Sequence, residues 1–111
     1  MKISLIYAYW PNQPGGVTWC DLPWALRDKG LPKKLNAAGH EVIETILMAE
    51  EPFAEEMPAG LRLAGDIAEA VREAADEGEL PVVVAGSCAI AAIGAIAGLG
   101  AGTRVAWFDA H

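Results

Sequence analysis

The residues best suited to chemistry lie at the end of the chain, where Asp109 and His111 follow an apolar run. In extended backbone the side chains at positions i and i+2 point to the same side, so a carboxylate oxygen and an imidazole nitrogen can converge on one ion. This pair suits a borderline cation such as Mn²⁺ or Zn²⁺. The other interpretation is a frayed terminus with two solvated polar residues, and the spacing alone leaves both open.

A second pair of reactive side chains, Ser87 and Cys88, follows the apolar run 81–85. Cys88 opens an expected helix, whose dipole and free amides favour the thiolate and so permit a metal ligand or a nucleophile. The alternative is a buried structural cysteine in an Ala-rich helix. Ser87 lies in a degenerate nucleophile elbow, with alanine at both glycine positions, and no triad acid and histidine follow it in the usual arrangement.

Other polar or glycine-rich stretches are better explained without chemistry. The glycines of 98–102 follow an expected helix and precede no Lys-Ser/Thr pair, which excludes a phosphate loop. His40 follows a helix end and is interpreted as structural. The acidic stretch 50–58 lacks the ligand spacing of a calcium loop and is predicted to be a solvated loop. The tryptophans are core or interface candidates, namely Trp10, Trp19, Trp24 and Trp107.

The elements that position these residues alternate between strands and helices. Apolar runs predict strands over 3–8, 42–47, 81–85 and 104–108. Helical periodicity and capping signals predict a short helix from Asp21 to Gly30 and further helices over 31–38, 61–77 and 88–99. This order implies an α/β fold in which parallel strands are joined by right-handed crossovers. Ligands of such sheets bind outside the carboxyl ends of the strands, where both reactive clusters fall.

Composition limits the class of protein. The 111 residues are 53% hydrophobic, which excludes a disordered chain and favours one domain over 1–111. The 8 basic and 15 acidic residues give a net charge of −7, which argues against nucleic acid and anionic lipid as partners. Two cysteines and no signal sequence favour a cytoplasmic protein with reduced thiols.

The stretch 80–103 carries no charge and is long enough to span a bilayer. Alanine and glycine dominate it, however, and Pro81 and the pair Gly86-Ser87 interrupt it, whereas membrane helices are rich in larger apolar residues with aromatic or basic anchors. A buried strand, turn and helix account for it better.

Three stretches together resemble the ureohydrolase superfamily, which includes arginase, agmatinase and formimidoylglutamase. The most specific is Val105–His111, which is similar to the start of the family's W-x-D-A-H-x-D metal motif. Pro81–Gly94 resembles, in degenerate form, the family's GGDHS-x-x-x-G segment. Supportive similarity lies in Gly16-Val17, Pro23–Arg27, Gly30-Leu31 and Gly39–Val42.

The resemblance implies a three-layer αβα fold with a mainly parallel sheet, of which this chain is the N-terminal part. It also implies a binuclear Mn²⁺ site that hydrolyses a C–N bond of a small guanidino or amidine substrate, because two metals lower the pKa of a bridging water. By position, Asp109 and His111 match family metal ligands, and Cys88 occupies the place of a ligand that is usually His. The resemblance assigns no catalytic or substrate-contacting residue in this chain, and the substrate stays unspecified.

This sequence departs from the family pattern in its metal ligands, and the departures change the activity that we expect. A thiolate is softer than imidazole and a poor match for Mn²⁺, so Cys88 is a doubtful ligand. The remaining family ligands are missing, so we expect an incomplete enzyme that is inactive as an isolated chain. A strand without a partner favours a homo-oligomer or association through the open sheet. Two other hypotheses are a non-catalytic α/β binding or assembly module and a hydrolase that uses Ser87 or Cys88.

Overall fold

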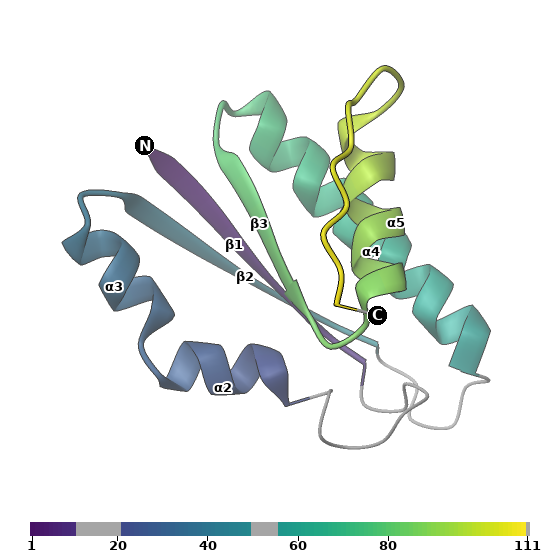
Figure 1. Cartoon of the computed structure of the whole chain (residues 1–111), viewed down its shortest axis with the longest axis horizontal. Helices are drawn as coiled ribbons and strands as arrows, with labels where there is room; N and C mark the ends of the chain where they lie inside the picture. Colours follow the sequence, from purple (N-terminus) through teal and green to yellow (C-terminus); the bar gives the residue numbers. More distant parts are fainter. Residues whose placement is uncertain (11–20, 50–55, 111) are drawn as a thin grey trace.

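The structure, a computed structural model, describes residues 1–10, 21–49 and 56–110, and of residues 56 and 57 it describes only the backbone. Within these ranges three parallel strands form one sheet in the order β2-β1-β3, flanked by four helices (Figure 1). The strands are β1 (Lys2–Tyr9), β2 (Glu41–Met48) and β3 (Leu80–Ala85). The helices are α2 (Leu22–Asp28), α3 (Leu31–Ala37), α4 (Glu56–Asp76) and α5 (Cys88–Leu99).

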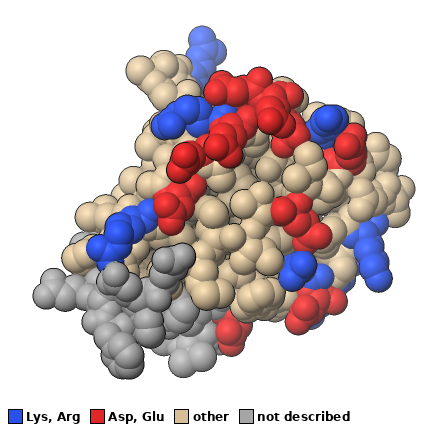
Figure 2. Space-filling model, turned by 180° about the vertical axis from the view of Figure 1, so that it is seen from behind, with Lys and Arg blue, Asp and Glu red and all other residues tan. Residues whose placement is uncertain are grey.

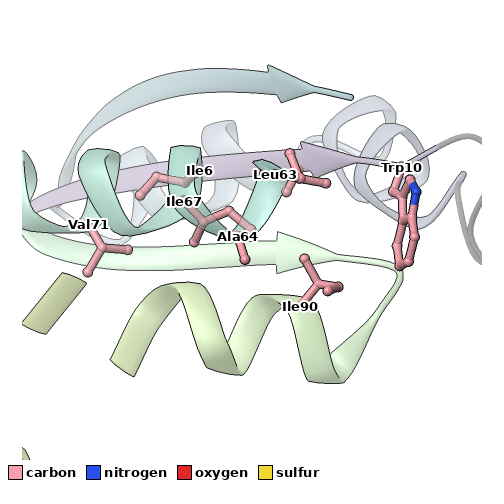
Figure 3. Packing of buried hydrophobic residues seen from close by; sticks show 8 residues of the cluster. Ile6, Trp10, Leu63, Ala64, Ile67, Val71 and Ile90 are labelled. Carbon is pink, nitrogen blue, oxygen red and sulfur yellow. The ribbon is translucent and has the colours of Figure 1, made fainter. Parts of the chain in front are cut away.

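The side chains of the central strand β1 alternate between two hydrophobic cores. Its odd-numbered residues pack against α2 and α3, in a core that combines Ile3, Leu5, Tyr7 and Tyr9 with Leu26, Leu31 and Leu35. Its even-numbered residues pack against α4 and α5, in a core that combines Ile6, Ala8 and Trp10 with Leu63, Ala64, Ile67, Val71 and Ile90 (Figure 3). Because helices cover both faces, the predicted three-layer αβα arrangement with a parallel sheet is confirmed.

Helix α5 approaches α4 closely because two of its residues lack side chains. A Cβ atom at Gly94 would lie 2.6 Å from Cγ2 of Ile67, and one at Gly98 would lie 2.6 Å from the carbonyl oxygen of Ala68. Real Cβ atoms do not approach other atoms so closely, so these positions require glycine. The small residues of 88–99 are therefore explained in part by helix packing. The helix was predicted to be buried, whereas only Ile90, Gly94 and Gly98 are buried and Ile93, Ile96 and Leu99 are exposed, so that prediction is wrong for the outer face of α5.

The two short helices α2 and α3 lie within the ranges predicted for them and end one or two residues earlier. Pro23 and Pro32 lie in their first turns, where a missing amide hydrogen costs little. Gly39, with φ of 94°, ends α3 in the left-handed region that glycine favours. Asp21 is the N-cap residue of α2, as the capping signal predicts, although its side chain makes no capping hydrogen bond.

Two other predictions of local structure are corrected. Residues 56–58 were predicted to belong to the solvated loop 50–58, whereas α4 begins at Glu56. Pro58 does not prevent this, because proline is tolerated in the first turn of a helix. Residues 50–55 lie outside the described part of the chain. The run 104–108 was predicted as a strand, whereas it forms no ladder and is exposed. Its apolar pattern gives it a high β-propensity, but a segment becomes a strand only when it pairs with the edge of another strand.

The uncharged stretch 80–103 divides into β3, a turn and α5, as expected from its proline and glycines. No helix in the described ranges is both long enough and apolar enough to cross a membrane.

Candidate functional site

The turn after β3 holds the first group of predicted site residues. Ser87 has extended backbone angles, φ −113° and ψ 114°, and its hydroxyl accepts a hydrogen bond from the amide of Ile90 at 3.5 Å, so Ser87 caps α5. Cys88 is the first residue of α5 and carries a free, exposed thiol. The alternative interpretation of Cys88 as a buried structural cysteine is therefore wrong.

Asp109 lies in the exposed segment that follows α5. Thr103 donates from its hydroxyl to the carbonyl of Gly100 at 2.9 Å, and this turn reverses the chain. In the view of Figure 1 the segment then returns toward the end of the molecule where α5 begins. The indole nitrogen of Trp107 donates to Oδ2 of Asp109 at 3.3 Å, which holds the carboxylate beside the ring. Trp107 is 56% exposed and so lies outside both cores, unlike Trp10.

The structure places two of the three residues that were predicted to bind a metal ion. Of the three candidate ligands, Cys88 and Asp109 are described, whereas His111 lies outside the described residues. In the described part of the chain, no three His, Cys, Asp or Glu side chains lie close enough to hold one metal ion. The described residues therefore do not by themselves fit the binuclear manganese centre that the resemblance implies.

The hypothesis of a serine or cysteine hydrolase gains no support from the described residues. The one histidine among them, His40, directly precedes β2, whereas Ser87 and Cys88 follow β3. Because the strands are parallel, these residues lie at opposite ends of the sheet. A general base must lie within hydrogen-bond reach of its nucleophile, and His40 does not.

An aromatic cluster at the carboxyl end of β1 was not predicted from the sequence. The rings of Tyr9 and Trp24 have centroids 4.2 Å apart at an interplanar angle of 33°, and the guanidinium carbon of Arg27 lies 5.9 Å from the Trp24 ring. Arg27 also forms an ion pair with Glu44 at 3.1 Å. The alternation of Tyr7 and Tyr9 along β1 was the available signal, because it places both rings on one face.

Burial changes the acid–base behaviour of the two tyrosines. Burial raises the pKa of Tyr9 to about 12, since the charged form loses hydration in the core. Burial likewise raises the pKa of Tyr7, and the negative charge of Glu44 adds to the rise. The hydroxyl of Tyr9 has no hydrogen-bond partner among the described residues. Because both pKa values are raised, both hydroxyls are neutral at physiological pH.

Comparison with known proteins finds similar solved structures but no matching family model or curated protein. No family model and no curated protein matches the chain. Among solved structures, the arginase of Bacillus subtilis subsp. subtilis strain 168 superposes with a TM-score of 0.78 at 23% identity, over 88% of this chain and 34% of that one. The chain has an arginase-like fold. A second structure of Bacillus subtilis arginase gives a TM-score of 0.76 at 23% identity, over 88% of this chain and 33% of that one.

Bacillus cereus arginase agrees as closely, with a TM-score of 0.78 at 23% identity, over 89% of this chain and 35% of that one. The predicted resemblance to the ureohydrolase superfamily is thus confirmed for the fold. The chain spans about one third of the length of these arginases. Structural similarity at such low identity establishes the fold alone, and a fold does not determine the chemistry.

Proposed function

We propose that this chain is the N-terminal part of a ureohydrolase-like enzyme that hydrolyses a C–N bond in a small guanidino or amidine compound with two Mn²⁺ ions. The observation that carries the proposal is the arginase-like fold over 88% of the chain. The Asp-Ala-His segment supports it, because Asp109 and His111 match ligands of that family. The described residues lack a complete ligand set, so the remaining ligands belong to parts of the enzyme beyond these residues.

As an isolated chain the protein is expected to be inactive. We would incubate the purified chain with Mn²⁺ and measure urea release from arginine and agmatine beside an intact arginase. The expected result is no turnover above the blank, because the metal centre is incomplete. Turnover comparable to that of the intact enzyme would overturn the incomplete-enzyme proposal.

The coding sequence after the codon for His111 gives a second test. The family motif requires an Asp two positions beyond this His, so we expect that residue. In the product of the whole reading frame, Asp109→Asn and His111→Ala should abolish Mn²⁺-dependent hydrolysis, whereas Asp66→Asn, an exposed carboxylate on α4, should not. Loss of activity in all three variants alike would show that the effect is not specific to the metal ligands.

A non-catalytic binding or assembly module built on the same fold is the second candidate. It is favoured by Cys88, a thiol at the usual place of a histidine ligand, and by the absence of a three-ligand cluster within the described ranges. Titration of the whole reading-frame product with Mn²⁺, Co²⁺ and Zn²⁺ separates the candidates. Binding of none of the three ions would support the module and contradict the hydrolase.

Association through the open sheet and a cytoplasmic location belong to the same proposal. In the described part of the chain β3 pairs with β1 on one side only, which leaves its other edge free. Unpaired edges favour pairing with further strands. The free thiol of Cys88 supports a reducing compartment, and cell fractionation with an antibody to the chain tests it.

A further inference from the structure

Helix α5 and the edge strand β3 together present an uncharged surface with exposed apolar side chains. Leu80 on β3 and Ile93, Ile96 and Leu99 on α5 are each 40–50% exposed, and the two elements are in contact. We call these four residues the α5–β3 surface. No charged residue occurs in 80–103, which contains both elements, although the whole chain has a net charge of −7. Figure 2 shows acidic and basic side chains on the face that is hidden in Figure 1.

The outer face of α5 has the composition of a buried surface. Apart from Cys88, all residues of the helix are Ala, Ile, Gly or Leu. One side of the helix, which contains its buried glycines, packs on α4, whereas Ile93, Ile96 and Leu99 form an exposed stripe at a spacing of three residues. A helix that is apolar on all sides is typical of a helix packed on all sides. The exposed stripe therefore indicates a covering element that the described part of the chain does not supply.

The free edge of β3 differs from the other free edge of the sheet in its charge. In the described part of the chain β3 pairs with β1 alone, and none of its residues is charged. Strand β2, at the opposite edge, carries Glu41 and Glu44, and Glu44 forms an ion pair with Arg27. Charged side chains on an edge strand oppose pairing with a further strand. Of the two edges, β3 is therefore the one at which the sheet can be extended.

The comparison with arginases indicates what covers the α5–β3 surface. The arginase structures match 88–89% of this chain but only 33–35% of their own length, so about two thirds of an arginase has no counterpart here. We propose that the α5–β3 surface is where this chain contacts that larger part of the enzyme. A strand of the larger part extends the sheet at β3, and an uncharged apolar face of it covers the stripe on α5. This inference rests on the proposed function, under which the larger part follows this chain in the same polypeptide.

The test introduces one charge into the surface in two proteins, the 111-residue chain and the product of the whole reading frame. In the 111-residue chain, Ile93→Lys should change the unfolding equilibrium constant less than about threefold, because the side chain is exposed there. In the whole product the same substitution buries a charge and should raise that constant at least about a hundredfold. Leu61→Lys is the matched control, since Leu61 is 53% exposed on α4, and it should change the constant less than about threefold in both proteins. Urea unfolding measures the constants.

Hydrogen exchange tests the edge of β3 independently of any substitution. Amides of β3 that do not pair with β1 should exchange at least about a hundredfold more slowly in the whole product than in the 111-residue chain, because a further strand protects them there. Equal exchange in the two proteins would contradict the extension of the sheet at β3.

An equal effect of Ile93→Lys in the two proteins would overturn the proposal. Conversion of an oligomer of the whole product to a monomer by Ile93→Lys would overturn it too, because the surface would then contact a second copy. If Ile93→Lys does not fold in the 111-residue chain, Ile93→Ala decides, with an effect of at least about tenfold expected only in the whole product. A reading frame that ends at His111 would overturn this proposal and the proposed function together. The other outcomes separate the two, since these measurements contain neither Mn²⁺ nor substrate.

Discussion

At the scale of single residues, the hydroxyls of Tyr7 and Tyr9 are the most unusual groups of the core. Both side chains are buried, and the hydroxyl of Tyr9 has no hydrogen-bond partner among the described residues. Removing one such group while keeping the ring leaves the packing intact and removes a desolvation cost. These two residues are also the only tyrosines of the chain, so their ionisation can be observed without interference from others.

The raised pKa of Tyr9 predicts a loss of stability at high pH. The unfolded chain releases this proton near 10.0 and the folded chain near 12, so the contribution is fully present below pH 10 and is lost as pH rises through about 12. We expect tyrosinate absorbance between these values in urea and little of it in buffer. Tyr9→Phe should flatten the fall of stability with pH, and equal titration in both solvents would contradict the prediction.

Gly94 gives a second prediction at this scale. Gly94→Ala forces a methyl group against Ile67 and should destabilise the chain by about 1–3 kcal/mol through overpacking. Gly65→Ala is the matched control, because Gly65 is exposed on α4 and its Cβ would meet nothing within 4 Å. The control should stabilise by about 0.5–1 kcal/mol through lower backbone entropy of the unfolded chain. Urea unfolding measures both, and equal effects would disprove the close helix contact.

At the scale of elements, α2 is tied to the sheet mainly by apolar packing. Pro23 is buried at its start and Leu26 joins the core beneath β1. The ion pair between these elements joins Arg27 to Glu44, whose side chains are 40% and 34% exposed, so water screens it. The helix is therefore expected to remain in place when this pair is removed.

A double-mutant cycle with Arg27→Gln and Glu44→Gln tests this expectation. The coupling free energy should be about 0.2–1 kcal/mol and should fall with added salt, as for other exposed pairs. Arg27→Gln should cost slightly more than Glu44→Gln, since it also removes the cation above the Trp24 ring. A salt-independent coupling well above this range would show that the pair is effectively buried.

At the scale of the whole molecule, the most exposed large apolar side chain among the described residues, Phe108, lies in the segment after α5. Phe108 is 94% exposed and Val105 is 55% exposed, in a segment with no ladder partner. Large exposed apolar side chains favour self-association. We therefore predict that the isolated chain associates with increasing concentration, as measured by sedimentation velocity.

Phe108→Asp and Trp107→Asp should shift the chain toward the monomer. Leu61→Asp provides the control, because Leu61 is similarly exposed, at 53%, but lies on α4. If the control dissociates the oligomer as strongly as the two variants, association is a general property of the surface. A monomer at all concentrations would contradict the prediction.

The β1, β2 and β3 strands and the helices α3, α4 and α5 could be predicted because their signals are local. Val82–Ala85 is an apolar run, Gly39 stops a helix, and α4 repeats its apolar residues at helical spacing. The prediction of a strand over 104–108 was wrong because strand propensity indicates only that a segment can pair, whereas a strand also requires the free edge of a sheet. The contact of the Trp24 ring with Tyr9 could not be predicted, since it joins a helix and a strand that the sequence does not place side by side.

The sequence by itself determined the alternation of elements, the parallel α/β class and the motif that resembles ureohydrolases, because periodicity, caps and motif residues are properties of neighbouring positions. Tertiary structure decided which of these residues meet. It separated His40 from Ser87 by the length of a parallel sheet and stacked Trp24 on Tyr9. Such contacts join residues distant in the chain, so only the packing of helices on the two faces of β1 could produce them.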